Sequence, residues 1–174
     1  MRCQRARVRP TGAAGGAFEE IVKGKRAMMF SIRRVRQDEG EMVIAIWRRA
    51  VDATHHFLTS ADKQDIEREV RAFLPQAPLW VAVTPQDRPV AFMLLSEDHL
   101  DALFVDPELR GCGVGRLLVK HALALIPSLT TDVNEQNAQA AGFYKKMGFV
   151  VTGRSPVDDC GRPYPLLHLR YRGA

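Results

Sequence analysis

The feature that most constrains the fold is a glycine turn between a strand-like run and a helix-like run. His99–Asp106 predicts a buried strand and Gly113–Ile126 predicts a helix, and the segment Arg110–Arg116 between them carries three glycines at alternate positions. Glycine adopts backbone angles closed to other residues and leaves neighbouring N–H groups unobstructed. The start of the following helix adds about half a positive charge. The turn therefore predicts an α/β domain that binds a phosphate or pyrophosphate at this strand–helix junction.

Two common phosphate-binding patterns do not match this turn. The Walker A pattern requires Gly-Lys-Ser/Thr, which is missing here. The dinucleotide pattern G-x-G-x-x-G fails because Arg116 stands in the place of its third glycine, although Asp132 lies at a suitable distance for its ribose-binding acid. The pattern Arg-x-x-Gly-x-Gly does match, through Arg110, Gly113 and Gly115.

Hydrophobic periodicity around the turn predicts one mixed α/β domain in the order β α α β β β α β α β β. Val43, Ile46, Trp47 and Ala50 have the spacing of one helix face. Thr59 and Asp62 predict a capping box at the start of the second helix. We expect helices near residues 38–52, 60–74, 113–126 and 137–147, and strands near 30–35, 79–83, 90–95, 99–106, 129–133, 149–153 and 165–171. The central strand–helix–strand stretch should be parallel in part.

The net charge of +5 belongs to the first 27 residues. They contain seven Lys/Arg and two Glu, so that residues 28–174 are neutral. This balance argues against nucleic acid and membrane as partners of the domain. We expect residues 1–27 to be a mobile, dispensable leader, either an upstream extension of the reading frame or an addition from cloning, with a nucleic-acid- or membrane-binding arm as the alternative. The domain is then residues 28–174.

Two further counts narrow the class of protein. No run approaches the roughly 18 apolar residues that span a bilayer. Three cysteines, Cys3, Cys112 and Cys160, are too few and too scattered for a disulfide scaffold. Both observations favour a cytoplasmic protein, and neither bears on its oligomeric state.

A second motif lies downstream of the turn. Val133, Asn137, Ala140, Phe143-Tyr144 and Gly148-Phe149 match the pattern V-x-x-x-N-x-x-A-x-x-F-Y-x-x-x-G-F. With both motifs in order, residues 28–174 resemble the GNAT superfamily of acyl-CoA-dependent N-acetyltransferases. The resemblance implies the GNAT acyl-CoA N-acyltransferase fold, a central and mostly antiparallel sheet with one splayed parallel pair, flanked by about four helices.

The resemblance also implies a site for acetyl-CoA and no metal ion. Backbone amides of the glycine turn would hold the pyrophosphate, and main-chain groups of Val105 would pair with the pantetheine arm, with Asn137 and Tyr144 facing the arm from the other side. The implied cofactor-binding residues are Val105, Arg110, Gly111, Cys112, Gly113, Val114, Gly115, Arg116, Asn137 and Tyr144.

Acetyl transfer to an amine sets three chemical requirements. A backbone N–H must stabilise the oxyanion, and the candidate is Val105. The leaving thiolate resembles a cysteine, with a pKa of about 8.5, and Tyr144 is the candidate general acid. A free lysine has a pKa of about 10.4, so that a base must accept a proton. Asp101, which strand alternation places on the same face as His99, and His55 are both candidates, and the sequence does not choose between them.

The sequence does not decide the acceptor of the acetyl group, and it leaves one other class of function possible. We expect direct attack in a ternary complex, with protein lysine as the acceptor and a small amine or amino acid as the alternative. Asp158 and Asp159 in the Ser155–Pro163 loop either attract a cationic amine or form a solvated turn. The rival from another class is a non-catalytic acyl-CoA-binding sensor domain.

Overall fold

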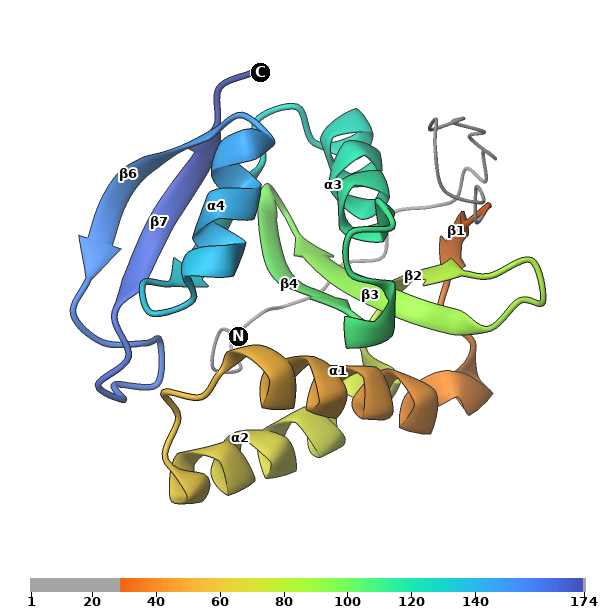
Figure 1. Ribbon diagram of the computed structural model, residues 1–174, viewed down its shortest axis with the longest axis horizontal. Helices are drawn as coiled ribbons and strands as arrows, with labels where there is room; N and C mark the ends of the chain where they lie inside the picture. Colours follow the sequence, from red (N-terminus) through yellow and green to blue (C-terminus); the bar gives the residue numbers. More distant parts are fainter. Residues whose placement is uncertain (1–28, 174) are drawn as a thin grey trace.

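A seven-stranded mixed sheet runs through the middle of the computed structural model, which describes residues 29–173 (Figure 1). The strand order is β1-β2-β3-β4-β5-β7-β6. The strands are β1 (Ser31–Arg34), β2 (Trp80–Val83), β3 (Pro89–Ser96), β4 (His99–Val105), β5 (Thr130–Asn134), β6 (Phe149–Ser155) and β7 (Leu166–Tyr171). The helices are α1 (Gly40–Thr54), α2 (Ser60–Phe73), α3 (Val114–Leu125) and α4 (Ala138–Lys146), with short 3-10 turns at Gln37–Glu39, Leu74–Gln76 and Pro107–Leu109.

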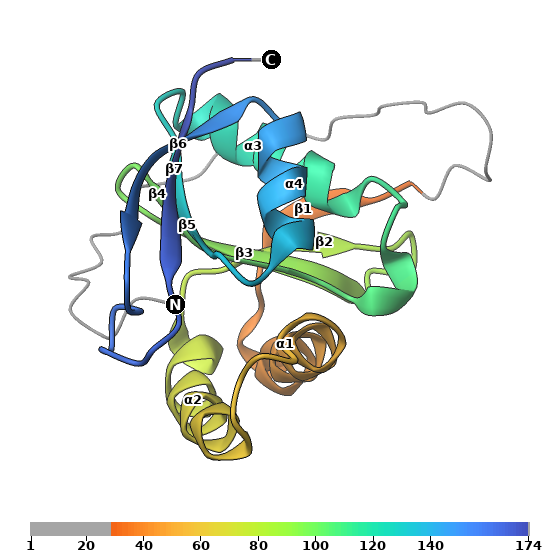
Figure 2. The ribbon, with the colours of Figure 1, turned by 60° about the vertical axis from the view of Figure 1, so that its left-hand side comes forward.

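The helices cover the two faces of the sheet in pairs. α1 and α2 lie on one face and α3 and α4 on the other, so that the sheet is sandwiched between two apolar layers (Figure 2). The four α1 residues with helical spacing, Val43, Ile46, Trp47 and Ala50, are all buried. The periodicity therefore identified the buried face of this helix correctly.

The start of α2 differs in detail from the predicted capping box. Thr59 Oγ1 accepts a hydrogen bond from the Asp62 N–H at 3.1 Å, as expected. The Thr59 N–H, however, donates to the Tyr164 hydroxyl at 3.1 Å rather than to the Asp62 carboxylate. Asp62 instead accepts from the hydroxyls of Thr59 and Tyr164. Aspartate is shorter than the glutamate of a capping box, and a tyrosine from the β6–β7 loop completes the cap.

The central strands form a fork. β4 pairs with β5 in parallel, at His99–Thr130 and Leu100–Thr131. The other neighbouring strands are antiparallel over longer stretches. β4 continues for five residues past Leu100 and β5 for three past Thr131, and these parts are not paired with each other. The expected fold, including the splayed parallel pair and the four helices, is confirmed.

Some expectations fall outside this description. Those for residues 1–27 lie beyond the described part of the chain. Over residues 29–173, no helix combines the length and the apolar character that crossing a bilayer requires.

Candidate active site

The glycine turn forms an uncapped helix start at the end of β4. Gly111 and Gly113 have φ of +77° and +85°, in the left-handed region that favours glycine. Gly113 is the N-cap of α3 and makes no side-chain cap. The first-turn N–H groups of α3, from Val114 to Arg116, therefore point out of the helix start beside Arg110, as an anion site requires. The Cys112 N–H is used within the turn, since it donates to the Leu109 carbonyl at 3.2 Å.

Gly115 brings the start of α3 close to the end of β4 and to α4. A Cβ built on Gly115 would lie 3.5 Å from Phe143 Cζ and 3.6 Å from Val105 Cγ2. The glycine turn, the end of β4 and one face of α4 thus meet at one point. These are the segments that the two sequence motifs bring together.

An ion pair between the exposed Arg49 and a buried carboxylate ties the turn to α1. Asp106, which follows β4 directly, is 4% exposed. Its Oδ2 accepts from Arg49 Nη2 at 2.6 Å, and its Oδ1 accepts from the Glu108 N–H at 3.3 Å. Sequence reasoning missed this pair, because the two residues are far apart in the chain. The ion pair fixes the backbone where β4 enters the turn.

The hydrogen bonds between β3 and β4 determine which backbone groups of β4 face the gap between β4 and β5. The Asp106 N–H donates to the Val90 carbonyl at 2.9 Å, and Val105 pairs with Ala91 in the same register. Alternate residues of an antiparallel strand direct their N–H and C=O groups to opposite sides. Val105 therefore presents its N–H toward the β5 side. Leu103, two residues nearer to the point where β4 and β5 stop pairing, also presents its N–H toward β5. The alternation of backbone groups along β4, counted back from Val105, would have identified Leu103 from the sequence.

Tyr144 lies with its hydroxyl at the fork point. The side chain is 6% exposed and packs edge-on against Phe143 and Phe149, with ring centroids 5.2 and 5.3 Å away. Its hydroxyl interacts with the side chain of Thr131, the last β5 residue that pairs with β4. Burial raises the pKa of Tyr144 above its ordinary value, so that the phenol is protonated at neutral pH. It is thus a core residue whose protonated hydroxyl lies at the fork.

Asn137 caps the start of α4. Its Oδ1 accepts from the Ala140 N–H at 3.1 Å, which makes it the N-cap of the helix that carries Tyr144. Because Oδ1 is used in this cap, the side-chain amide nitrogen of Asn137 is the atom that would contact a cosubstrate.

A pocket on the other face of the sheet lies between α1, α2 and the β6–β7 loop. Its volume is about 90 Å³. The apolar walls are Trp47, Val51, Leu58, Ile66, Phe104 and Leu166. The charged lining consists of Glu69, Asp158, Asp159 and Arg162, three carboxylates against one guanidinium.

His55 lines this pocket at the C-cap of α1. The Thr54 hydroxyl donates to the Ala50 carbonyl at 2.6 Å, so its oxygen accepts from His55 Nδ1 at 2.7 Å. Nε2 is then the nitrogen that carries the free lone pair. Burial lowers the pKa of His55 to about 4, and the ring is neutral at neutral pH. A group with so low a pKa is a weak base.

The β6–β7 loop is held against α2 by polar contacts. Arg162 Nη2 donates to Glu69 Oε1 at 2.6 Å, and Arg162 Nη1 lies 3.6 Å from Asp158 Oδ2. The buried Tyr164 donates to Asp62 Oδ2 at 2.5 Å. Among residues 29–173, Asp159 makes no ion pair and is exposed at the pocket rim.

Asp101, the other candidate base, stands at a bulge. Leu94 pairs with Ala102 and Leu95 with Leu100, so that Asp101 is the extra residue in β4. Its carboxylate is hydrogen-bonded to the Ser96 hydroxyl. The alternation that placed Asp101 on the same face as His99 does not apply at a bulge.

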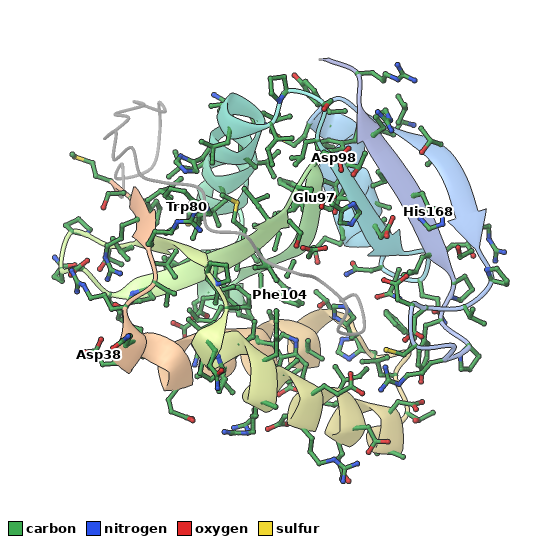
Figure 3. The ribbon with its side chains drawn as sticks, turned by 180° about the vertical axis from the view of Figure 1, so that it is seen from behind. Asp38, Trp80, Glu97, Asp98, Phe104 and His168 are labelled. Atoms are coloured by element: carbon green, nitrogen blue, oxygen red, sulfur yellow. The ribbon has the colours of Figure 1, made fainter. Side chains whose placement is uncertain are left out.

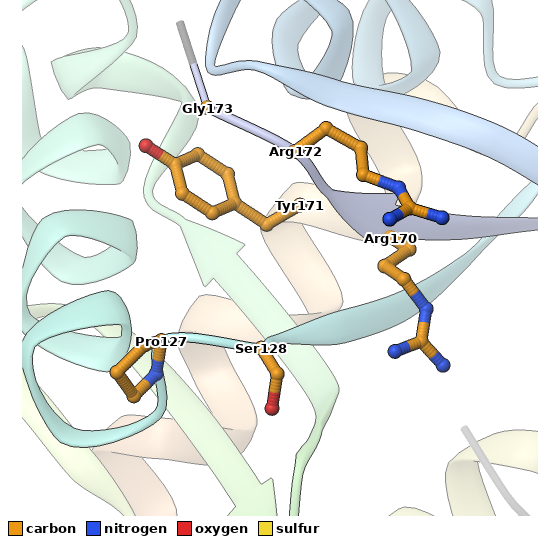
Figure 4. Close-up of a pocket in the computed structure, with 6 residues that line it drawn as sticks. All are labelled: Pro127, Ser128, Arg170, Tyr171, Arg172 and Gly173. Carbon is orange, nitrogen blue, oxygen red and sulfur yellow. The ribbon is translucent and has the colours of Figure 1, made fainter.

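A second, open pocket lies at the opposite end of β5 from the fork (Figure 4). Pro127, Ser128 and the segment from Arg170 to Gly173 line its volume of about 350 Å³. None of the predicted site residues lies there. In the described part of the chain, no group of three or more His, Cys, Asp or Glu side chains is arranged to hold a metal ion.

Comparison with known proteins assigns the architecture to a family. The model of the acetyltransferase (GNAT) domain matches residues 37–162. The peptidyl-lysine N-acetyltransferase YjaB of Escherichia coli is 65% identical over 147 residues, which are 84% of this chain and 100% of that protein. The enzyme of the same name from Salmonella typhimurium is 67% identical over 144 residues, 83% of this chain and 99% of that protein.

A solved structure agrees with the fold. The solution structure of the apo form of YjaB from Escherichia coli superposes with a TM-score of 0.82 at 65% identity. The match covers 84% of this chain and 100% of that structure.

Proposed function

This chain belongs to the GNAT family of acetyltransferases, and we propose that it transfers the acetyl group of acetyl-CoA to the side-chain amine of protein lysine, by direct attack in a ternary complex. The observation that carries the proposal is the combination of the uncapped glycine turn with a buried, protonated Tyr144 at the fork. The names of the two enterobacterial relatives, which match over almost their whole length, favour lysine as the acceptor.

The residues of the turn fit the pyrophosphate of acetyl-CoA. Gly111 and Gly113 have no side chains to obstruct the turn, and the first N–H groups of α3 supply donors with a favourable helix dipole. Arg110 and Arg116 flank these donors. When bound there, acetyl-CoA supplies the activated acetyl thioester.

The geometry of the fork supports the remaining roles that we propose for this chain. Val105 and Leu103 direct backbone N–H groups into the gap between β4 and β5, where they would pair with the arm of acetyl-CoA and stabilise negative charge on the acetyl oxygen. Tyr144 holds its proton until the thiolate leaves.

The pocket beneath α1 and α2 supports an amine acceptor. Its apolar walls suit the methylene stem of lysine, and its carboxylates outnumber its cations. His55 is neutral there and adds no repulsion. Asp159 is the carboxylate at the rim that makes no ion pair in residues 29–173, and it would attract a cationic substrate.

The acceptor assignment is tested by reversing this charge. Asp159→Lys should raise the KM for lysine peptides about tenfold and leave the Kd for acetyl-CoA unchanged. Asp38→Lys changes the net charge equally at an exposed residue far from the pocket, and should leave both constants unchanged (Figure 3). Equal KM values for the two variants would contradict the assignment.

Residues 1–27 are assigned no part in this function. A protein that begins at Met28 should acetylate the same peptides as the full chain. Loss of activity on truncation would favour the alternative in which the basic leader contributes a binding arm.

A further inference from the structure

The pocket between α1, α2 and the β6–β7 loop reaches both strands of the fork. Phe104 of β4 and Asn134 of β5 line it together, and Phe104 lies between the sheet and the two helices (Figure 3). The two strands last pair at Leu100 and Thr131, so both lining residues belong to the parts of β4 and β5 that are not paired with each other. A side chain that fills the pocket therefore ends beside the gap between these strands.

The side chain of Asn134 is directed to the pocket by the alternation of β5. Its neighbour Val133 is buried in the core on the α3 and α4 side of the sheet, so that Asn134 faces α1 and α2. Asn134 pairs with Leu166 of β7, which lines the same pocket. Its carbonyl also accepts from the Asn137 N–H at 2.9 Å. The β7 pairing and this turn together fix the backbone at Asn134.

Asn134 also stands level with the backbone donors of β4. Counted from the last parallel pair, Leu100 and Thr131, Asn134 is three residues along β5. Three residues along β4 is Leu103, and the bulge at Asp101 takes up one residue of that count. Because strands have nearly the same rise per residue, Asn134 lies across the gap from the segment Leu103–Val105. It thus faces the place where an acetyl group held by the N–H groups of that segment is attacked.

The carboxamide of Asn134 is available to a ligand. Most charged groups of the pocket are already engaged, since Arg162 bonds Glu69 and lies close to Asp158. Within residues 29–173, the half-buried Asn134 side chain makes no hydrogen bond. The pocket therefore offers an unpaired carboxylate at its rim, on Asp159, and a carboxamide with free hydrogen-bonding capacity at the end nearest the fork.

The attacking amine needs an acceptor of this kind. It must be neutral, and its lone pair must point at the acetyl carbon, so that its N–H bonds point elsewhere. A carboxamide oxygen accepts a hydrogen bond from such an N–H. A carboxylate in the same place would favour the charged ammonium, which has no lone pair to attack with.

We propose that Asn134 positions the acceptor amine, with its side-chain oxygen accepting a hydrogen bond from the amine N–H while the lone pair faces the acetyl carbon in the gap. This inference rests on the proposed acetyl transfer. The two unpaired groups then divide the work of the pocket. Asp159 attracts the cation at the rim, and the neutral Asn134 holds the deprotonated amine for attack. Asn134 orients the amine and takes no proton from it.

The role is tested in the full chain with Asn134→Leu and Asn134→Asp, using acetyl-CoA and a lysine peptide. Leucine has a similar size and no acceptor, so this variant should lower kcat about tenfold, with the Kd for acetyl-CoA within about twofold of the unaltered protein. Aspartate keeps an acceptor but adds a negative charge, which raises the pKa of the bound amine. The rise of kcat with pH should therefore shift to higher pH in Asn134→Asp, and stay in place in Asn134→Leu.

The shift reports on position 134 because the other ionisable groups around the pocket are common to all the variants. On β5 the nearest such residue is Asp132, which is hydrogen-bonded to His168. Those that line the pocket from α1, α2 and the β6–β7 loop are His55, Glu69, Asp158, Asp159, Arg162 and Tyr164.

Gln76→Leu is the matched control. It makes the same chemical change at an exposed residue just beyond the far end of α2, which does not line the pocket, and it should keep the unaltered kcat and pH dependence. Unchanged kcat in Asn134→Leu would overturn the proposed role. A loss of kcat in both Asn134 variants, without the shift in Asn134→Asp, would also overturn it and leave Asn134 a structural residue. Absence of acetylation by the unaltered protein would overturn the proposed function, and this inference with it.

Discussion

The Tyr144 hydroxyl interacts with the Thr131 side chain at the residue where β4 and β5 stop pairing. The Thr131 hydroxyl donates to the Leu100 carbonyl at 2.9 Å. The contact places a proton on the α4 side of the fork and ties α4 to the sheet. The same side chain packs in the core and carries the hydroxyl that we propose as the general acid.

Tyr144→Phe should lower kcat about 100-fold or more, because the phenyl ring packs equally well but carries no proton. The Kd for acetyl-CoA should change less than about threefold. Steady-state kinetics with a lysine peptide and calorimetric titration of acetyl-CoA measure the two quantities. Thr131→Val keeps the phenol and removes its partner, and it should retain more kcat than Tyr144→Phe. Equal turnover in Tyr144→Phe and the unaltered protein would refute the general-acid role.

Gly113→Ala should weaken acetyl-CoA binding about tenfold. A φ of +85° costs a residue with a Cβ about 1–2 kcal/mol, and the turn relaxes away from the geometry that presents its N–H groups. Gly161→Ala imposes similar strain at φ +79° in the β6–β7 loop and should leave acetyl-CoA binding intact. If calorimetry finds equal Kd values for the two variants, the turn does not hold the pyrophosphate.

Arg49→Ala should destabilise the fold by about 1–3 kcal/mol, because it leaves the buried Asp106 carboxylate without its cation. It should also raise the KM for acetyl-CoA, since Asp106 fixes the entry to the glycine turn. Arg48→Ala removes a neighbouring cation whose partner, Glu67, lies at the surface, and should change neither quantity appreciably. Urea denaturation and initial rates provide the comparison.

His55 should make the fold sensitive to acid. Burial lowers its pKa from 6.5 to about 4, so that the unfolded chain binds a proton more readily than the folded one between these values. The stabilisation is complete above about pH 6.5 and is lost as the pH falls toward 4, by about 2 kcal/mol between about pH 7.5 and about pH 5. His55→Asn should lose this part of the pH dependence in urea denaturation. An unaltered slope in the variant would show that the ring is not buried as described.

The fold could be predicted because its signals are local. The helical spacing from Val43 to Ala50 marks a buried face without reference to any other segment. The glycine turn and the second motif are each contiguous in the sequence. The cap of α2 could be predicted only in part, because Tyr164 enters it from a distant loop. Asp101 illustrates the same limit, since strand alternation gives no sign of a bulge.

The same distinction between local signals and contacts of distant segments applies to the candidate site. Tyr144 and the glycine turn belong to motifs and Val105 ends the strand before the turn, so that all three could be named from the sequence. The ion pair of Arg49 with Asp106 and the pocket that Phe104 and Asn134 line together join residues of separate elements. Strand order and register bring such side chains together, and no periodicity in the sequence encodes the order in which β7 lies between β5 and β6.

Release of the coenzyme A thiol would show whether this protein transfers acetyl groups to lysine. The release would be followed with acetyl-CoA and a panel of lysine peptides, amino acids and polyamines. We predict thiol release that depends on the lysine peptide, together with a matching gain of one acetyl group on the lysine. Silence across the panel from protein that binds acetyl-CoA would contradict the account and favour an acyl-CoA sensor, whereas release only with small amines would contradict the lysine assignment alone.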